Sequence, residues 1–587
     1  MWFDQGNELF DFCRTSFFAY LILALPIFVS ISPTCLASKE FSAFRLQQFE
    51  LHGSSYGTSG SLLNLETRIL PGSPMVSSPR RCYVVRLVDL TVNMYKDLLT
   101  AQVAGIVIIV PADLSSISGE IRDQIQELEQ AMLSDFTTVP VYFIQETQEV
   151  NQVYQTIKES AESLGAASSA LQTLFHHVHG NGVQLVSSLG SPKVMSDAQI
   201  LSIQGALIGT KASRSFPILI STHYDSMSPA AELSFGGDAN GSGAVSLLEL
   251  ARVFSHLYST RGTGAGSGAG GSKIGGRPPN SILFLMSGAG HFNYQGTQKY
   301  LEDQVDSSDQ SDLQDTRLVV CLDSLTTNPE KLFVHVSRSI REGTMLNTFI
   351  NNLKKAAAHL EPSFTVEVVQ RKIRTENLLS WEHEKFHLKK INAITISSSE
   401  SPSLVKSSML DVKDNVDTEN LAAKTRIVAE ALAASLYNVT EVGTAFSGSL
   451  GVSDESVNSL LEFVTSQPRS AQLLAGKQNK FVQSLRNVLA RYTHETSLFT
   501  MKPDKRDANL VFYDGTSGTI VAYDVKPAVF DLVLSLAIAS YIGAVYLAIK
   551  NFSLIYDALS YKLSSISSNH TSTTNGTSGH SSKVKAQ

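Results

Sequence analysis

Cysteine and tryptophan are scarce in this 587-residue sequence, and it contains no long run of one charge. Only two of its four cysteines, Cys82 and Cys321, lie beyond the first 37 residues. A disulfide scaffold is therefore excluded, and the two thiols are interpreted as buried free cysteines, with a single disulfide as the open alternative. The net charge of -7 is spread along the chain, which excludes the basic face that nucleic-acid binding requires.

The chain has enough apolar residues to bury large cores. Hydrophobic residues make up 43% of it and charged residues 17%, which is typical of a globular protein. A length of 587 residues exceeds one compact domain, so two or three folded units are expected. With so few cysteines, core burial must stabilise these units.

Both ends of the chain carry apolar segments. Residues 17–32 follow Arg14 and precede small residues, which predicts a signal peptide over 1–37. Acidic residues before this segment leave an uncleaved anchor open as the alternative. Residues 527–549 are apolar apart from Asp531, which predicts a transmembrane helix.

Lysines beyond the second segment place the tail, 550–587, in the cytosol. The expected arrangement is a type I membrane protein with most of its mass in the lumen or outside the cell. The alternative for 527–549 is a buried core helix. It is disfavoured because the tail that follows is rich in Ser, Thr and Asn and offers no further core.

Residues 40–172 are predicted to form a small α/β unit. Short β-branched runs bounded by Pro, Gly or Asp alternate with helical patterns, which favours parallel strand pairing. The strand candidates are 81–87, 104–110 and 139–144.

Residues 173–440 are predicted to form a larger, three-layer α/β/α domain with a mostly parallel sheet. The strand candidates are 182–187, 198–208, 218–220, 281–286, 318–322, 332–336 and 393–396, and the helices are 244–257, 297–304, 343–359 and 418–437. A Gly- and Ser-rich stretch, 261–279, is predicted to be a disordered loop. Residues 441–525 are expected to form membrane-proximal helices and a hairpin of 508–513 with 519–523.

One motif carries most of the chemical information. The strand candidate 218–220 runs into Ser221-Thr-His-Tyr-Asp-Ser226, and a Gly-rich turn with a second Asp follows at 236–243. A two-metal peptidase needs a bridging Asp, further His or carboxylate ligands, and a free carboxylate as general base. His-x-Asp at a strand end is how such a site begins.

The sequence from 173 to 440 resembles the M28 zinc-aminopeptidase family. Over nearly its whole length it resembles the nicastrin-related, endoplasmic-reticulum branch of that family. The segments that carry the resemblance are Thr222-His-Tyr-Asp225, Gly237-Asp-Ala-Asn-Gly-Ser-Gly243, Phe292-Asn-Tyr-Gln-Gly-Thr297, Cys321-Leu-Asp323, Trp381-Glu-His-Glu-Lys-Phe386 and Met409-Leu-Asp-Val412.

Carried over by position, the family's metal site is half present. The resemblance implies that His223 is a ligand, Asp238 the bridging ligand and Asp323 a further carboxylate, with Asp225 orienting His223. The general-base position holds Gly290 and the next ligand position holds His291. No histidine occurs between His387 and His494, so the last ligand is missing.

We therefore expect no peptidase activity and no required cofactor, since losing the base and a ligand set removes water activation. Weak zinc binding at His223, Asp238 and Asp323 is the alternative. The plainer interpretation is that these residues fix loops at the strand ends through hydrogen bonds.

A second metal pattern and several sequons are also present. His383-Glu-Lys-Phe-His387 matches the zincin pattern literally, but its context favours a chance match. Asn438-Val-Thr predicts a luminal glycosylation site, whereas Asn240 lies in the Gly-rich turn and is expected to be unmodified. Sequons at Asn569 and Asn575 would report the side on which the tail lies.

The resemblance implies a non-catalytic binding or assembly subunit of the endoplasmic reticulum membrane. The implied partners are a Nodal-modulator-type luminal-repeat membrane protein and a small multi-span membrane protein. The implied setting is a ribosome-bound translocon that makes multi-spanning proteins, with an influence on receptor assembly. The alternatives are an active or single-zinc membrane aminopeptidase and a cell-surface receptor.

Overall fold

The computed structural model describes a set of ranges that leaves out the leader, several loops and most of the tail. The described residues are 38–69, 81–165, 182–210, 217–259, 277–306, 316–373, 378–402, 408–439, 442–443, 445–446, 451–476, 478–502, 509–525, 528–554, 556–557 and 560. The predicted signal peptide, almost all of the predicted loop 261–279, and Asn569 and Asn575 lie outside them. The chain divides into two compact units, one of Met1–Gln155 with Gln184–Tyr523 and one of Thr156–Val183 with Asp524–Gln587.

An eight-stranded sheet forms the centre of the first unit. Its order is β15 (Thr365–Gln370), β14 (Lys331–Val336), β16 (Ala393–Ser397), β13 (Leu318–Leu322), β11 (Ile218–His223), β12 (Ile282–Ser287), β10 (Ile200–Leu207) and β17 (Glu495–Met501). The four strands β16, β13, β11 and β12 are mutually parallel, and β14 pairs with β15 in parallel. The remaining three pairs are antiparallel, so the sheet is mixed.

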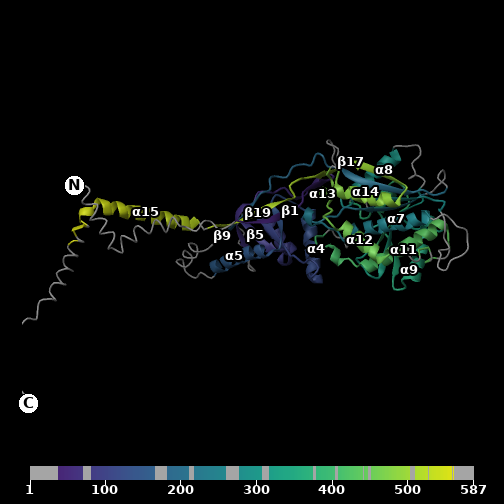
Figure 1. Ribbon diagram of the computed structural model, residues 1–587, viewed down its shortest axis with the longest axis horizontal. Helices are drawn as coiled ribbons and strands as arrows, with labels where there is room; N and C mark the ends of the chain where they lie inside the picture. Colours follow the sequence, from purple (N-terminus) through teal and green to yellow (C-terminus); the bar gives the residue numbers. More distant parts are fainter. Residues whose placement is uncertain are drawn as a thin grey trace, which may run out of the picture. The chain divides into compact units, whose positions relative to one another are not determined.

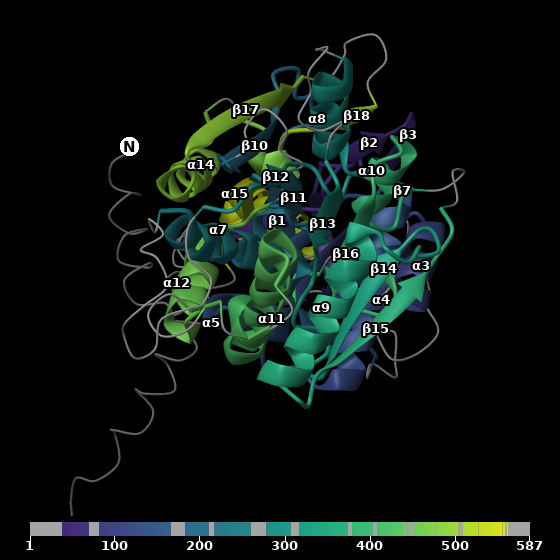
Figure 2. The same ribbon diagram turned by 90° about the vertical axis from the view of Figure 1, so that its right-hand side faces the viewer.

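Helices cover both faces of this sheet because its central strands are apolar on both sides. Along β11, Ile218 and Ile220 belong to one buried cluster and Leu219 belongs to another. Figure 2 shows the corresponding two groups of helices on opposite sides of the strands. The first group is α7 (Gly243–Ser259), α9 (Met345–Leu360), α11 (Thr418–Tyr437), α12 (Asp454–Val464) and α14 (Lys480–Tyr492), and the second is α8 (Gln295–Asp306) and α10 (His383–Leu388).

A closed barrel forms the other part of the first unit, and Figure 1 shows several of its strands gathered together. Its order is β1 (Lys39–Arg45), β19 (Ser517–Val525), β9 (Gly182–Ser187), β4 (Asn64–Ile69), β5 (Cys82–Arg86), β6 (Gly105–Val110) and β8 (Val141–Gln145). The helices that follow its strands are α3 (Val92–Thr100), α4 (Gly119–Ser134) and α5 (Gln148–Gly165). The parallel pairs β4–β5, β5–β6 and β6–β8 agree with the α/β character expected there.

The barrel and the eight-stranded part share a core. A bridge joins Leu46 to Ala230, and the backbone N–H of Met409 donates to the carboxylate of Glu129 on α4 at 2.8 Å. A small sheet borders this region, in the order β18 (Leu510–Phe512), β2 (Phe49–Leu51), β3 (Ser54–Thr58) and β7 (Phe136–Thr137).

Three features differ from the expectations drawn from the sequence. The predicted hairpin of 508–513 with 519–523 is wrong, because β18 pairs with β2 and β19 pairs with β1. The strand 182–187 belongs to the barrel and not to the larger sheet. Strands β15 and β17, and the packing of α12 and α14 onto the main core, were not anticipated.

Long-range burial explains these differences. In β18, Leu510 and Phe512 are buried against β2, and in β19 Ile520 is fully buried opposite Phe41 of β1. Closing the barrel removes exposed strand edges, and this gain exceeds that of a local hairpin. Residues 441–525 therefore complete structures that begin far earlier in the chain.

The second unit contains α15 (Ala528–Lys550). Its segment Asp531–Lys550 has a mean hydropathy of 2.2 and is long and apolar enough to cross a membrane. Leu532, Leu536 and Ile542 are each about 60% exposed. A helix that is apolar on all sides without being buried in protein is typical of a membrane span, in keeping with the span predicted at 527–549.

Candidate functional site

His223 is the last residue of β11, and the buried strand fixes its position at the carboxyl edge of the sheet. Its ring meets the ring of His291 edge to face at 5.0 Å between centroids, and that of Tyr294 at 5.7 Å. Within the described part of the chain, its Nδ1 atom has no hydrogen-bond partner. Burial, with His291 and Arg469 nearby, lowers the pKa of His223 well below its ordinary value. The ring is therefore neutral.

Asp225 does not orient His223, which differs from the role implied by the family pattern. Its two carboxylate oxygens accept the backbone N–H groups of Gly290 at 2.7 Å and of His291 at 3.3 Å. Burial raises the pKa of Asp225 to about 6, and the two amides oppose that rise. The carboxylate fastens the loop after β12 to the end of β11.

Gly290 lies so close to His223 that a side chain has no room there. A Cβ atom at this position would be 2.1 Å from Cγ of the His223 ring. The surrounding loop has left-handed backbone at Ala289, Asn293 and Tyr294. Such conformations are costly for residues with side chains and persist only where the surrounding structure enforces them. A general base cannot occupy position 290 in this arrangement.

Asp238 stands in the Gly-rich turn and is already engaged by neutral partners. Its carboxylate accepts the Ser242 hydroxyl at 2.8 Å, the Thr326 N–H at 2.9 Å and the Thr327 hydroxyl at 2.6 Å. Asp411, in turn, accepts the N–H groups of Asp238 at 2.8 Å and of the residue after it at 2.7 Å. These hydrogen bonds hold the turn in place.

Gly243, at the start of α7, permits the close approach of three chain segments. A Cβ atom there would lie 2.7 Å from the carbonyl oxygen of Leu322 and 2.8 Å from the Thr222 hydroxyl. Asp323 follows directly on β13 and is buried, and its carboxylate accepts the Ser324 hydroxyl at 3.2 Å. Burial raises the pKa of Asp323 to about 7.

The side chains do not fit a two-zinc centre. The charge of Asp238 contributes to the raised pKa of Asp323, and His291 contributes to the lowered pKa of His223. However, in the ranges that the structure describes, no three His, Cys, Asp or Glu side chains converge closely enough to hold a metal ion. This includes His223, Asp238 and Asp323, the set considered for weak zinc binding. Zinc requires three or four such ligands.

The space beside Asp225 is also too small for a substrate. The cavity lined by Asp225, Tyr224, Gly288 and Ile200 has a volume of about 10 Å³. A single water molecule needs ~10–15 Å³ measured in this way. The residues at the strand ends therefore pack against one another.

Two functional side chains, Arg469 and Lys424, could not be assigned from the sequence. Both are fully buried beside the strand-end loops. Lys424 directly follows the small and apolar run Leu421-Ala-Ala, which is a detectable signal. Arg469 lies in the short connection between α12 and α13 (Ala471–Leu474) and carries no such signal.

The literal zincin match does not form a metal face. His383 is buried, its Nδ1 atom lies 2.8 Å from the Thr395 hydroxyl and its Nε2 atom lies 3.0 Å from the Ser337 hydroxyl. The helix that carries it has only six residues. Because both ring nitrogens are hydrogen-bonded, His383 is a core histidine, in agreement with the interpretation as a chance match.

The cysteines and the two described sequon asparagines have clear environments. Cys82 and Cys321 are buried free thiols. Asn438 is exposed at the C-terminal cap of α11, with left-handed backbone that asparagine tolerates. Asn240 is fully buried and accepts the Thr222 hydroxyl at 3.1 Å.

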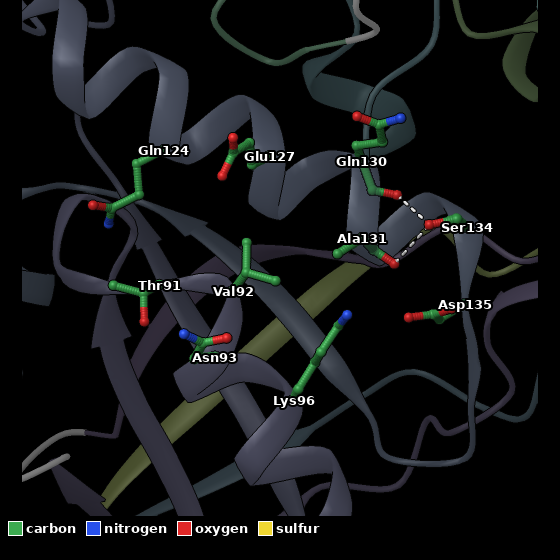
Figure 3. A pocket seen from close by; sticks show the side chains of 10 residues that line it. All are labelled: Thr91, Val92, Asn93, Lys96, Gln124, Glu127, Gln130, Ala131, Ser134 and Asp135. Atoms are coloured by element: carbon green, nitrogen blue, oxygen red, sulfur yellow. Dashed lines mark hydrogen bonds between the residues drawn. The ribbon is translucent and has the colours of Figure 1, made fainter. Parts of the chain in front are cut away.

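A larger groove lies between α3 and α4, with a volume of about 620 Å³. Figure 3 shows its lining, in which side chains from both helices surround the space. The lining is mostly polar and includes Asn93, Lys96, Gln124 and Glu127. None of these four side chains is buried, so the groove contains no preorganised charge.

Comparison with known proteins places these observations in a family. Residues 205–432 match peptidase family M28. The BOS complex subunit ncln of Danio rerio is 37% identical over 582 residues, which cover 95% of this chain and 98% of that protein. The BOS complex subunit NCLN of Homo sapiens is 38% identical and covers 94% and 97% of the two chains.

The chain belongs to the nicalin family. A nicalin of Caenorhabditis elegans is 28% identical over 568 residues, covering 92% of this chain. The γ-secretase component nicastrin shares the fold, with a TM-score of 0.54 at 12% identity, covering 83% of this chain and 98% of nicastrin. The nicastrin-related resemblance noted in the sequence is thereby confirmed.

Proposed function

We propose that this nicalin-family protein is non-catalytic and serves as a binding and assembly subunit of a complex in the endoplasmic reticulum membrane. Its folded part would lie in the lumen, anchored by α15. The complex would accompany the translocon during the synthesis of multi-spanning membrane proteins and influence receptor assembly. The names of the relatives, which are subunits of the BOS complex, support this proposal.

The partners in this proposal are membrane proteins. They are a Nodal-modulator-type protein with luminal repeats and a small multi-span protein, with the translocon and ribosome reached indirectly and no direct contact with nucleic acid. The apolar helix α15 supports membrane anchoring. The exposed position of Asn438 supports a luminal glycan at that residue.

The occupied strand-end positions are the observation that carries the non-catalytic part. Gly290 has no side chain and no room for one beside His223. Asp225 accepts two backbone amides, and the cavity beside it has a volume of about 10 Å³. A peptidase needs a general base, a metal-activated water and a substrate cleft at this place.

A turnover assay separates this proposal from an active or single-zinc aminopeptidase. The detergent-solubilised chain, supplied with zinc and aminoacyl fluorogenic substrates, should show no more turnover than the His223→Ala variant. Metal analysis of the same sample should find well under one zinc ion per chain. Zinc-dependent turnover that is abolished by His223→Ala would favour the aminopeptidase.

Affinity purification in mild detergent, followed by mass spectrometry, tests the partner assignment. We expect a luminal-repeat membrane protein and a small multi-span protein at near-stoichiometric levels. Their absence would contradict the assembly role. Glycan analysis tests the location: high-mannose glycans on Asn438 fit retention in the endoplasmic reticulum, whereas complex glycans would favour a cell-surface receptor.

A further inference from the structure

Arg469 holds together the two ends of the loop that follows β11. Its Nη1 donates to the carbonyl oxygen of Tyr224 at 2.6 Å and its Nε to that of Phe235 at 3.0 Å. Its Nη2 donates to the carbonyl oxygen of Gly236. The side chain is fully buried, so these three backbone carbonyls replace the water that would otherwise solvate the guanidinium group.

Lys424 does the same for two other strand-end loops. Its Nζ donates to the carbonyl oxygen of Leu325 at 2.9 Å and to that of Asn328, both in the loop after β13. It also donates to the Ser398 hydroxyl, just after β16, at 2.7 Å. A single ammonium group from α11 thus connects the ends of two neighbouring strands.

Each cation lies within electrostatic reach of acids of the site, Arg469 of the buried Asp225 and Asp411 and Lys424 of the half-buried Asp238. The Arg469 charge lowers the pKa values of Asp225 and Asp411 against the upward effect of burial. Asp238 attracts the Lys424 charge and so opposes the lowering of the Lys424 pKa by burial. Among the contacts described, these pairs do not approach as direct ion pairs, because backbone amides and hydroxyls already engage the carboxylates.

A buried cluster of carboxylates without any cation would be costly. In the M28 pattern two metal ions would supply the positive charge, but the side chains here do not fit those ions. Arg469 and Lys424 supply positive charge at the same strand ends. Each is held there by hydrogen bonds to backbone carbonyl oxygens, which bind cations well. The two side chains reach the loops after β11, β13 and β16.

We propose that Arg469 and Lys424 are the resident cations of this site, which counter the charges of Asp225, Asp411 and Asp238 and fix its loops in place of bound metal. The folded state is consequently independent of zinc. This inference rests on the proposed function in one respect only, that the site holds no catalytic zinc. It adds a definite chemical reason for the stability of the strand ends without metal.

Chemical rescue tests the role of Arg469 in the full-length chain. Arg469→Ala removes the donor to three backbone carbonyls, two of them in buried hydrogen bonds, and we expect its melting temperature to fall by roughly 3–6 °C. Millimolar guanidinium chloride should restore part of that loss, because guanidinium can enter the vacated space. Equal concentrations of urea, which has a similar shape but no charge, or of sodium chloride should not. A variant that melts like the wild type, or that urea restores equally well, would overturn the inference.

Lys424→Met is the second arm, with Lys385→Met as its matched control. Lys385 is also largely buried, but among the described residues it donates only to the side chain of Gln298, at 2.9 Å. We expect Lys424→Met to lower the melting temperature clearly more than Lys385→Met does. Equal losses would contradict a special role for Lys424. This arm remains informative if Arg469→Ala does not fold.

Zinc dependence provides the third readout and needs no variant. Neither added zinc nor a strong chelator should change the melting temperature of the wild-type chain, whereas a ligand bound to the native state would raise it. A chelator that lowers it overturns this inference. Zinc-dependent peptidase turnover would instead refute the proposed function, so the two failures are distinguishable.

Discussion

The strand ends of the eight-stranded sheet and the groove between α3 and α4 differ in complementary ways. The strand ends gather acids, histidines and two buried cations, but the space beside Asp225 is only about 10 Å³. The groove offers about 620 Å³, but its polar side chains are not buried. A site that has reactive side chains but no cavity cannot admit a substrate. A cavity without preorganised side chains cannot act on one.

Helix α4 connects the two regions. Glu127 and Gln130 on one side of it line the groove, whereas Glu129 on the other side is fully buried and bonded to the backbone of Met409. The same helix therefore presents an adaptable surface to solvent and a fixed contact to the peptidase-like part. Four variants test how far this contrast extends.

Gly290→Ala should have the largest effect. The new Cβ would collide with the His223 ring, and overpacking of this kind typically costs about 3 kcal/mol or less, with larger values where the neighbours cannot move. We expect the free energy of unfolding, measured by denaturant titration, to fall by about 3 kcal/mol. Gly119→Ala, at an unobstructed position in α4, is the control and should change it little. Equal losses in the free energy of unfolding for the two variants would show that the strand ends can accommodate an added methyl group.

Glu129→Gln should remove a pH dependence. Burial raises the pKa of Glu129 from 4.5 to about 8, so the folded state keeps its proton in a range where the unfolded state has lost it. Wild-type stability attributable to this group is therefore greatest below pH ~5 and is lost as the pH rises towards ~8, by up to about 1.4 kcal/mol per pH unit.

The glutamine variant lacks this titration, and its stability relative to wild type should rise with pH across that window. Urea titrations of both proteins at several pH values measure the difference. If the stabilities of the two proteins changed in parallel with pH, water would have more access to Glu129 than its burial indicates.

Asp225→Asn should have a smaller effect. In the variant an NH2 group replaces one of the two carboxylate oxygens that accept the N–H groups of Gly290 and His291. One buried N–H then faces a donor and loses its partner, at a cost of about 1–3 kcal/mol. Removing a buried charge offsets part of that cost. Hydrogen exchange should accelerate at the amides of residues 290 and 291 before it does elsewhere. Unchanged exchange there would argue against the fastening role of Asp225.

Lys96→Ala should have the smallest effect. Lys96 is an exposed residue of the groove, and substitutions at such positions usually change stability by about 0.5 kcal/mol or less. Thermal melting should not distinguish the variant from wild type. A clear loss would mean that the groove is part of the folded framework, and the contrast with the strand ends would then be weaker.

Much of the site was predictable, but its geometry was not. His223, Asp225 and Asp238 were identified because a strand, a short motif and a Gly-rich turn leave local signals, whereas Asp323 was implied by the resemblance to the M28 family. The partners of Asp225 were not, because the amides of 290 and 291 come from a loop that only the sheet brings alongside. The lack of space at Gly290 depends likewise on the ring of a residue 67 positions earlier in the chain.

The sequence by itself determined the central strands, the helices between them and the apolar helix near the C-terminus, because periodicity and continuous apolar character act over a few residues. Only the tertiary structure decided that β18 and β19 part to join different sheets, and that Arg469 and Lys424 become buried beside the strand-end acids. Those outcomes depend on which distant segments exclude water from one another. A side chain becomes the counter-charge of a site only when the fold removes every alternative way to solvate it.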